Sequence, residues 1–155
     1  MTDQDEIPEQ KNRLGDAFFR LAAGYYQPDP ELRRNLRELP ELLRPLSSEL
    51  AVAAGQVLSE LEDEDSEELL REYSRLFVGP FELGAPPFGS VYLESEGLMM
   101  GRSTVEADRI YREAGLEMSP DFQSPPDHVA AELEFLAYLC FREGNSQDPQ
   151  EAQFF

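Results

Sequence analysis

The sequence predicts an all-α fold, and three observations lead to this prediction. Apolar residues recur at intervals of three and four through most of the chain, which is the spacing of one helix face. Prolines and glycines interrupt these stretches where helices are expected to begin and end. No stretch alternates between apolar and polar residues as a half-buried strand does. With 155 residues and 41% apolar content, residues 1–155 are expected to form one domain, a helical bundle.

Three helices are expected in the first part of the chain. The first spans residues 8–26, and the second begins at an aspartate-proline cap at 29–30 and ends at Pro40. A short leucine-rich turn follows, and the third helix is capped by Ser47 or Ser48. The apolar positions of this third helix, all expected to face inward, are Leu50, Ala53, Ala54, Val57, Leu58 and Leu61.

Two more helices and a long ordered loop are expected next. Asp65 has the position of an N-cap for a fourth helix, which Gly79 and Pro80 end. Residues 81–101 hold four glycines and no sustained period, so they are predicted to form the ordered loop between the fourth and fifth helices. A loop of this length is uncommon in a compact domain unless it is functional. Ser103 is expected to cap the fifth helix, which ends at Gly115.

A sixth helix is predicted to begin at or just after Pro126. The two prolines at 125–126 favour extended backbone before a helix, and the aspartate that follows favours the positive end of the helix dipole. A hinge is therefore expected near residues 119–127, and the helix closes at Gly144. Residues 148–149 resemble one further helix start, which suggests that the sequence ends inside an element; a short terminal turn is the alternative. The expected buried stripe of the sixth helix is Val129, Leu133, Leu136, Ala137 and Cys140.

The charge is strongly acidic, with 13 basic against 32 acidic side chains and a formal net charge of -19. Such a surface repels phosphate backbones and anionic lipids, so neither nucleic acid nor a membrane is an expected partner. The acidity suits a cationic partner, but solubility alone or a high-salt cytoplasm explains it equally well. No apolar run is long enough to span a bilayer and no secretory signal is present, so a cytoplasmic location is expected.

No catalytic, metal or cofactor site is expected. His128 is the only histidine and Cys140 the only cysteine, which is poor material for a zinc site. No Walker-type glycine loop occurs, and Ser90 lacks the following glycine of a nucleophile elbow. A hydrolase built on His128 therefore stays only as a third possibility. The structural interpretation of the Asp127-His128 pair is an N-terminal cap together with a histidine that pairs with Glu132 one turn later.

Several stretches together resemble the TorD/DmsD/NarJ-type chaperones, which assist the maturation of molybdenum-containing oxidoreductases. The resemblance covers about residues 14–143, and its specificity lies in the order of the motifs. The family continues past the hinge helix with further helices, so the carboxyl-terminal helices are expected to be missing from this sequence. In chain order the matching stretches are Tyr73-x-x-Leu76-Phe77-x-Gly79-Pro80, Ala85-Pro86-Pro87 through Ser90-Val91-Tyr92, residues 97–101, residues 111–115, and Pro125-Pro126-Asp127-His128 with Glu132-Leu133.

The resemblance implies an all-helical cytoplasmic chaperone that is not an enzyme and carries no cofactor. It would bind the twin-arginine signal peptide, or the apo form, of a molybdenum-cofactor oxidoreductase subunit before export or assembly. Asp127 and Glu132 would meet the arginines of the peptide, and Leu76 and Phe77 its apolar part. The implied peptide-binding residues are Tyr73, Leu76, Phe77, Pro86, Ser90, Tyr92, Asp127, His128 and Glu132.

Two questions stay open at the level of sequence. The alternative function is an acidic helical interaction module without specificity for signal peptides. The expected oligomeric state is a monomer or a homodimer that exchanges its carboxyl-terminal helices through the hinge.

Overall fold

The computed structural model describes residues 3–79, 83–94 and 99–144. Within these residues all regular elements are helical, and one isolated bridge joins Phe88 to His128. This confirms the predicted all-α fold, and no helix in the described ranges is long and apolar enough to cross a bilayer. The expected helix start at residues 148–149 lies outside the described residues. The elements are α1 (Asp3–Ala23), α2 (Leu32–Leu36), α3 (Leu39–Leu43), α4 (Ser48–Asp63), α5 (Ser66–Tyr73), the π-helix η1 (Ser74–Val78), α6 (Gly89–Leu93), α7 (Arg102–Glu113) and α8 (Val129–Gly144).

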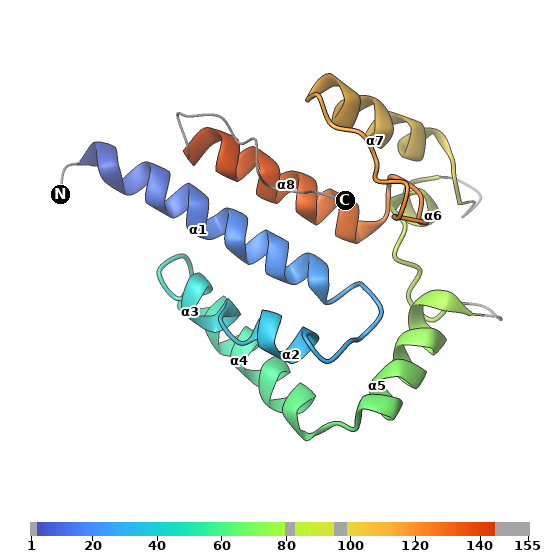
Figure 1. Cartoon of the computed structure of the whole chain (residues 1–155), viewed down its shortest axis with the longest axis horizontal. Helices are drawn as coiled ribbons and strands as arrows, with labels where there is room; N and C mark the ends of the chain where they lie inside the picture. The colour runs from blue at the N-terminus through green and yellow to red at the C-terminus, as the bar shows by residue number, and fades with distance from the viewer. Residues whose placement is uncertain (1–2, 80–82, 95–98, 145–155) are drawn as a thin grey trace.

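The long helices α1 and α8 form the most extensive helix–helix contact and run antiparallel (Figure 1). Small residues allow this close approach, since a β-carbon on Gly15 would meet the Phe141 ring at 2.8 Å. At the other end of the pair, the Tyr26 hydroxyl donates to Glu134 Oε1 over 2.6 Å. The alanines that become almost fully buried on the two helices are Ala17, Ala22, Ala130, Ala131 and Ala137.

The face of α8 that is buried differs from the predicted stripe. Leu136 is 42% exposed, whereas Glu134 and Tyr138, which were not expected inside, are buried. The cause is the small-residue contact with α1, which turns the alanines rather than the leucines towards the neighbouring helix. The helix also begins at Val129 rather than at Pro126, because residues 125–128 form a turn in which His128 N donates to the Pro125 carbonyl.

A second core lies on the other side of α1, where α2, α3 and α4 pack (Figure 1). The single helix predicted for residues 29–40 is wrong, because α2 ends at Leu36 and α3 begins at Leu39. Pro40 stands in the first turn of α3 instead of ending a helix, and a proline loses no helical hydrogen bond there. The buried residues of this core are Ala17, Leu32, Leu36, Leu39, Leu43 and Ala51.

The predicted cap of α4 is confirmed, and its inward stripe is confirmed in part, since Ala54, Leu58 and Leu61 pack against the core. Ser47 Oγ accepts the Leu50 N–H over 3.3 Å, as expected for an N-cap. Ala51 is the buried position, while Leu50 and Val57 are 55% and 53% exposed. Part of the apolar face of α4 is therefore open among the described residues.

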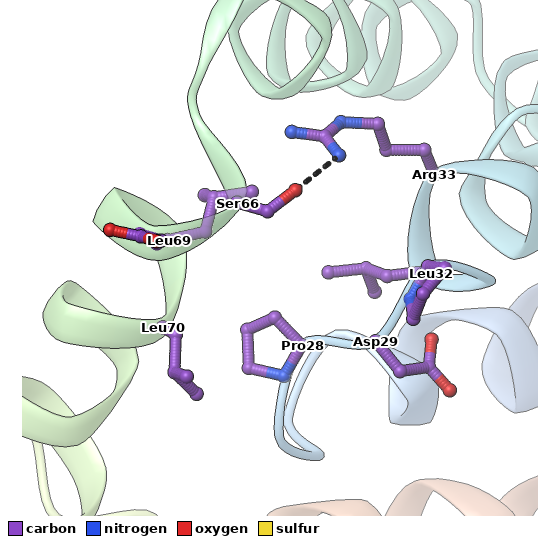
Figure 2. A pocket seen from close by; sticks show the side chains of 9 residues that line it. Pro28, Asp29, Leu32, Arg33, Ser66, Leu69 and Leu70 are labelled. Carbon is purple, nitrogen blue, oxygen red and sulfur yellow. Dashed lines mark hydrogen bonds between the residues drawn. The ribbon is translucent and has the colours of Figure 1, made fainter.

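Helix α5 is capped as predicted, because Asp65 Oδ1 accepts the Glu67 N–H over 2.8 Å. The predicted fourth helix continues to Val78, but its last turn is a π-helix, with the Gly79 N–H bonded to the Ser74 carbonyl over 2.9 Å. Arg33 joins α2 to this region, since its Nε donates to the Leu61 carbonyl at the end of α4 over 2.8 Å. Figure 2 shows Arg33 also reaching Ser66 at the start of α5.

Residues 81–101 are not without regular structure, because they contain the short helix α6. Ser103 does not cap α7; instead Glu94 Oε1 accepts the Ser103 N–H over 2.9 Å, so a carboxylate from the residue just after α6 satisfies the helix start. The end of α7 matches the prediction. Gly115 has φ +85°, and the Leu116 N–H reaches the Tyr111 carbonyl over 2.9 Å, as in a left-handed C-cap.

Candidate functional site

A cavity of about 310 Å³ lies where four distant parts of the chain meet, and we call it the hinge pocket. The end of α1, the π-helix η1, the segment 85–92 and the start of α8 contribute to it. Four predicted site residues therefore come together here: Phe77, Pro86, Tyr92 and Glu132. The full lining is Tyr25, Phe77, Ala85, Pro86, Pro87, Phe88, Gly89, Tyr92, Val129 and Glu132.

Aromatic rings build the wall of the pocket on the side of η1. The Phe77 ring lies 5.3 Å from the Tyr73 ring and 6.0 Å from the Tyr25 ring, measured between centroids. A π-helical turn holds one more residue than an α-helical turn, so it changes which side chains lie on the same face of the helix. Such turns are frequent at functional sites. Leu76 lies against Gly84, where a β-carbon would approach its Cδ2 at 3.1 Å. Tyr73 packs on Phe77, and neither Tyr73 nor Leu76 lines the cavity.

Backbone hydrogen bonds fix the opposite wall. The Val129 N–H donates to the Pro87 carbonyl over 2.8 Å, and the Gly89 N–H donates to the Asp127 carbonyl over 2.9 Å. These bonds pair the 87–89 segment with the start of α8 around the Phe88–His128 bridge. The predicted loop and the predicted hinge are therefore one structural unit.

Asp127 lies beneath the pocket and is 1% exposed. Its Oδ2 accepts the Ser90 N–H over 2.7 Å, and Ser90, which is itself buried, accepts the Met100 N–H at its hydroxyl over 3.2 Å. Burial opposes ionisation, but the hydrogen bonds from Ser90 outweigh it and hold the Asp127 pKa below its usual value. The Thr104 hydroxyl lowers the Asp127 pKa less than Ser90 does, because neither its oxygen nor Asp127 Oδ1 is within ordinary hydrogen-bond geometry of a partner. Asp127 therefore holds the loop and does not face the cavity.

His128 is likewise buried, at 5% exposed, and is held as a neutral ring. Its Nδ1 accepts the Ala130 N–H over 3.1 Å, so the ring caps the start of α8. The Phe88 and Phe122 rings meet it edge to face at 5.4 and 5.8 Å. Burial lowers the His128 pKa, and the nearby Asp127 charge offsets this only in part. The Glu132 N–H donates to the His128 carbonyl over 3.1 Å, but in the described part of the chain no side-chain hydrogen bond or ion pair joins the two residues, so the expected pairing of the side chains is not found.

The lowered pKa of His128 predicts a pH dependence of stability. The unfolded chain takes up a proton near pH 6.5, while the folded protein resists it. The contribution of the neutral His128 ring to stability is therefore fully present above pH 6.5, and it is lost as the pH falls towards the lower pKa of the folded protein. His128→Asn keeps an oxygen acceptor for the Ala130 N–H but does not titrate, so its unfolding free energy is expected to fall less between about pH 7 and pH 5. Urea unfolding of both proteins across this range measures the difference, and equal pH slopes would contradict it.

Glu132 is the carboxylate that remains available at the pocket rim. Its side chain is exposed, yet the surrounding protein displaces enough water to raise its pKa, and the Asp127 charge adds to the shift. A bound cation would stabilise the ionised form of Glu132, because its positive charge offsets both the loss of water and the repulsion by Asp127.

Sequence reasoning missed part of the site. Tyr25 lines the pocket, but in the sequence it was only one apolar position of the first predicted helix. Ala85, Pro87 and Gly89 line it mainly because the backbone of this segment passes the cavity. In the described ranges, no group of three or more His, Cys, Asp or Glu side chains is placed to hold a metal ion.

Comparison with known proteins points to one family. The family model of the nitrate reductase delta subunit matches residues 28–154. The Tat proofreading chaperone DmsD of Salmonella typhi is 32% identical over 83% of this chain and 61% of its own length. The chaperone protein TorD of Photobacterium profundum is 28% identical over 90% of this chain and 58% of its own length. The chain therefore spans about three fifths of the length of these curated relatives.

A solved structure supports the same fold. A redox enzyme maturation protein from Archaeoglobus fulgidus superposes with a TM-score of 0.61 at 23% identity, covering 88% of this chain and 76% of its own. The names of the relatives describe chaperones and not catalysts, in agreement with the expected non-enzymatic role. The chain belongs to the nitrate reductase delta subunit family, and its resemblance to TorD/DmsD/NarJ-type maturation chaperones is confirmed.

Proposed function

We propose that this chain acts as a cytoplasmic chaperone in the maturation of a molybdenum-cofactor oxidoreductase subunit. It binds the twin-arginine signal peptide, the apo form of the subunit, or both, before export or assembly. The observation that supports this most directly is the hinge pocket, which combines aromatic and proline walls with one exposed carboxylate. A twin-arginine leader carries the complementary chemistry, since it joins a basic region to an apolar one.

The residues of the site take different parts in this proposal. Glu132 meets an arginine of the leader, while Phe77, Pro86 and Tyr92 form the apolar contact. Asp127 was expected to meet arginines as well, but its burial and its bond to the Ser90 N–H favour a supporting role. Ser90 and His128 are also buried, so we assign them to holding the loop and the start of α8.

Replacing Glu132 with glutamine tests the proposal. We expect the affinity for a fluorescein-labelled twin-arginine leader peptide, measured by fluorescence anisotropy, to fall by about tenfold or more, because a partly desolvated ion pair is lost. The matched control is Glu117→Gln, since Glu117 is exposed and lies outside the pocket but gives the same change in net charge. An equal loss in both variants would show that only the overall charge matters.

The alternative function is an acidic helical interaction module without specificity for signal peptides. The high negative charge of the chain favours this alternative as much as it favours the chaperone. A peptide in which both arginines are replaced by lysines separates the two, because nonspecific attraction is nearly unchanged while bidentate recognition of arginine is lost.

We also propose that the protein is a monomer or a homodimer exchanged through the hinge near residues 119–127. Exchange would place α8 of one copy against α1 of the other and would re-form the bonds between residues 87–89 and 127–129 across copies. Light scattering coupled to size-exclusion chromatography distinguishes the two states.

A further inference from the structure

A second apolar surface adjoins the hinge pocket, and we call it the α4 groove. It is a cavity of about 500 Å³ between α1, the α2–α3 segment and α4. Its walls include Leu21 of α1, Tyr25 in the turn after α1, Leu43 of α3, Leu50 and Val57 of α4, and Phe77 of η1. Apart from Gly24, every lining side chain is apolar or aromatic.

The α4 groove leaves open a helix face that the sequence pattern marks for burial. Leu50 and Val57 occur at the helical spacing of an inward stripe, yet more than half of each side chain is exposed. An open apolar face of this kind, next to a pocket, is typical of a surface that receives another polypeptide.

The α4 groove is continuous with the hinge pocket. Tyr25 and Phe77 line both cavities, and their rings lie 6.0 Å apart. A single extended or helical peptide can therefore pass from Glu132 at the hinge pocket, across these two rings, and along α4.

The charges beside the groove favour an occupant without acidic residues. Glu49 is next to Leu50, and Glu60 follows Val57 by one helical turn. In the described part of the chain, no arginine or lysine forms an ion pair with either of them. An apolar segment that carries acids would be repelled, whereas a neutral or basic apolar segment would not.

We propose that the α4 groove holds the apolar stretch of the client's leader while the hinge pocket holds its arginines. This rests on the proposed function and adds a direction to the bound peptide: the arginines lie beside Glu132 and the following residues run towards Leu50. The leader is favoured over other occupants because its basic and apolar regions are contiguous, as the two cavities are.

The test uses two fluorescein-labelled synthetic peptides and the full chain. The long peptide has two adjacent arginines followed by about 12 leucine and alanine residues, enough for a short helix, and the short peptide stops after the arginines. Val57→Asp is expected to weaken binding of the long peptide by about tenfold or more and to leave binding of the short one unchanged. The matched control is Val52→Asp, because Val52 lies on the same helix at 62% exposed but does not line the groove.

Each other outcome decides against the inference in a distinct way. Equal binding of the long peptide by Val57→Asp and the unmodified protein would show that the leader does not use the groove, while the proposed function would stand. A dimer that Val57→Asp converts to a monomer would assign the groove to a second copy. Tighter binding after deletion of residues 145–155 would assign it to the chain's own end. Failure of the unmodified protein to bind either peptide would overturn the signal-peptide part of the proposed function together with this inference.

Discussion

Replacing Gly144 with alanine is expected to lower the free energy of unfolding by about 1–3 kcal/mol, the usual cost of overpacking. Gly144 is buried at the end of α8, where it faces the start of α1. A β-carbon there would overlap the Asn12 side chain and would come within 3.0 Å of the Pro8 carbonyl oxygen. The Asn12 amide can move, but the carbonyl belongs to the α1 backbone, so α1 and α8 would have to separate.

The matched control is Gly55→Ala in α4. Nothing lies within 4 Å of a β-carbon at Gly55, so alanine there meets no neighbour. Because alanine is the better helix former, we expect this variant to gain about 0.5–1 kcal/mol. Urea unfolding followed by circular dichroism measures both changes. A loss of stability at Gly55 equal to that at Gly144 would contradict the assignment of the Gly144 loss to the contact between α1 and α8, because alanine at Gly55 meets no neighbour.

Removing the carboxylate of Asp127 is expected to cost about 1–3 kcal/mol, the penalty for a buried donor that loses its partner. In Asp127→Ala the Ser90 N–H loses its acceptor at a site from which water is excluded. Asp127→Asn keeps an oxygen acceptor without the charge, so its loss is expected to be smaller. Because the folded pKa of Asp127 lies below 3.8, its contribution is fully present above pH 3.8 and is lost as the pH falls through the folded value.

A second measurement separates local from general effects of the Asp127 substitution. Hydrogen exchange is expected to quicken at the amides of residues 89–91 and of Met100, which depend on the link between Asp127 and Ser90. The control is Asp121→Ala, which removes the same charge from an exposed position within the hinge segment 119–127. Unchanged exchange at these amides in Asp127→Ala would contradict the role of Asp127 as the residue that holds the loop.

Local sequence signals placed several helix ends correctly because they act within one turn. Ser47 and Asp65 cap their helices through hydrogen bonds to residues two or three positions on, and Gly115 adopts the left-handed conformation expected of it. The cap of α7 could not be predicted in this way. The Glu94 side chain, just after α6, accepts the hydrogen bond at the start of α7, so this cap depends on how α6 packs beside α7.

The candidate site was predicted in part. Motif order indicated Phe77, Pro86, Tyr92 and Glu132, and the fold brings these four side chains to one cavity. The same reasoning placed Asp127 and His128 among the peptide-binding residues, although both side chains are buried. Their burial depends on the 87–89 segment pairing with the start of α8, a contact between residues about 40 positions apart that no local pattern encodes.

The sequence by itself determined the all-helical class, several helix ends, the acidic surface and the family, because helical period, capping and motif order are local properties. Tertiary structure alone decided which helix faces are buried and which stay open. The alanines of α8 pack on α1 because small side chains let two helices approach closely, and this turns Leu136 outward. Leu50 and Val57 of α4 border an open groove and stay exposed, because no other helix of the described chain fills the space beside them.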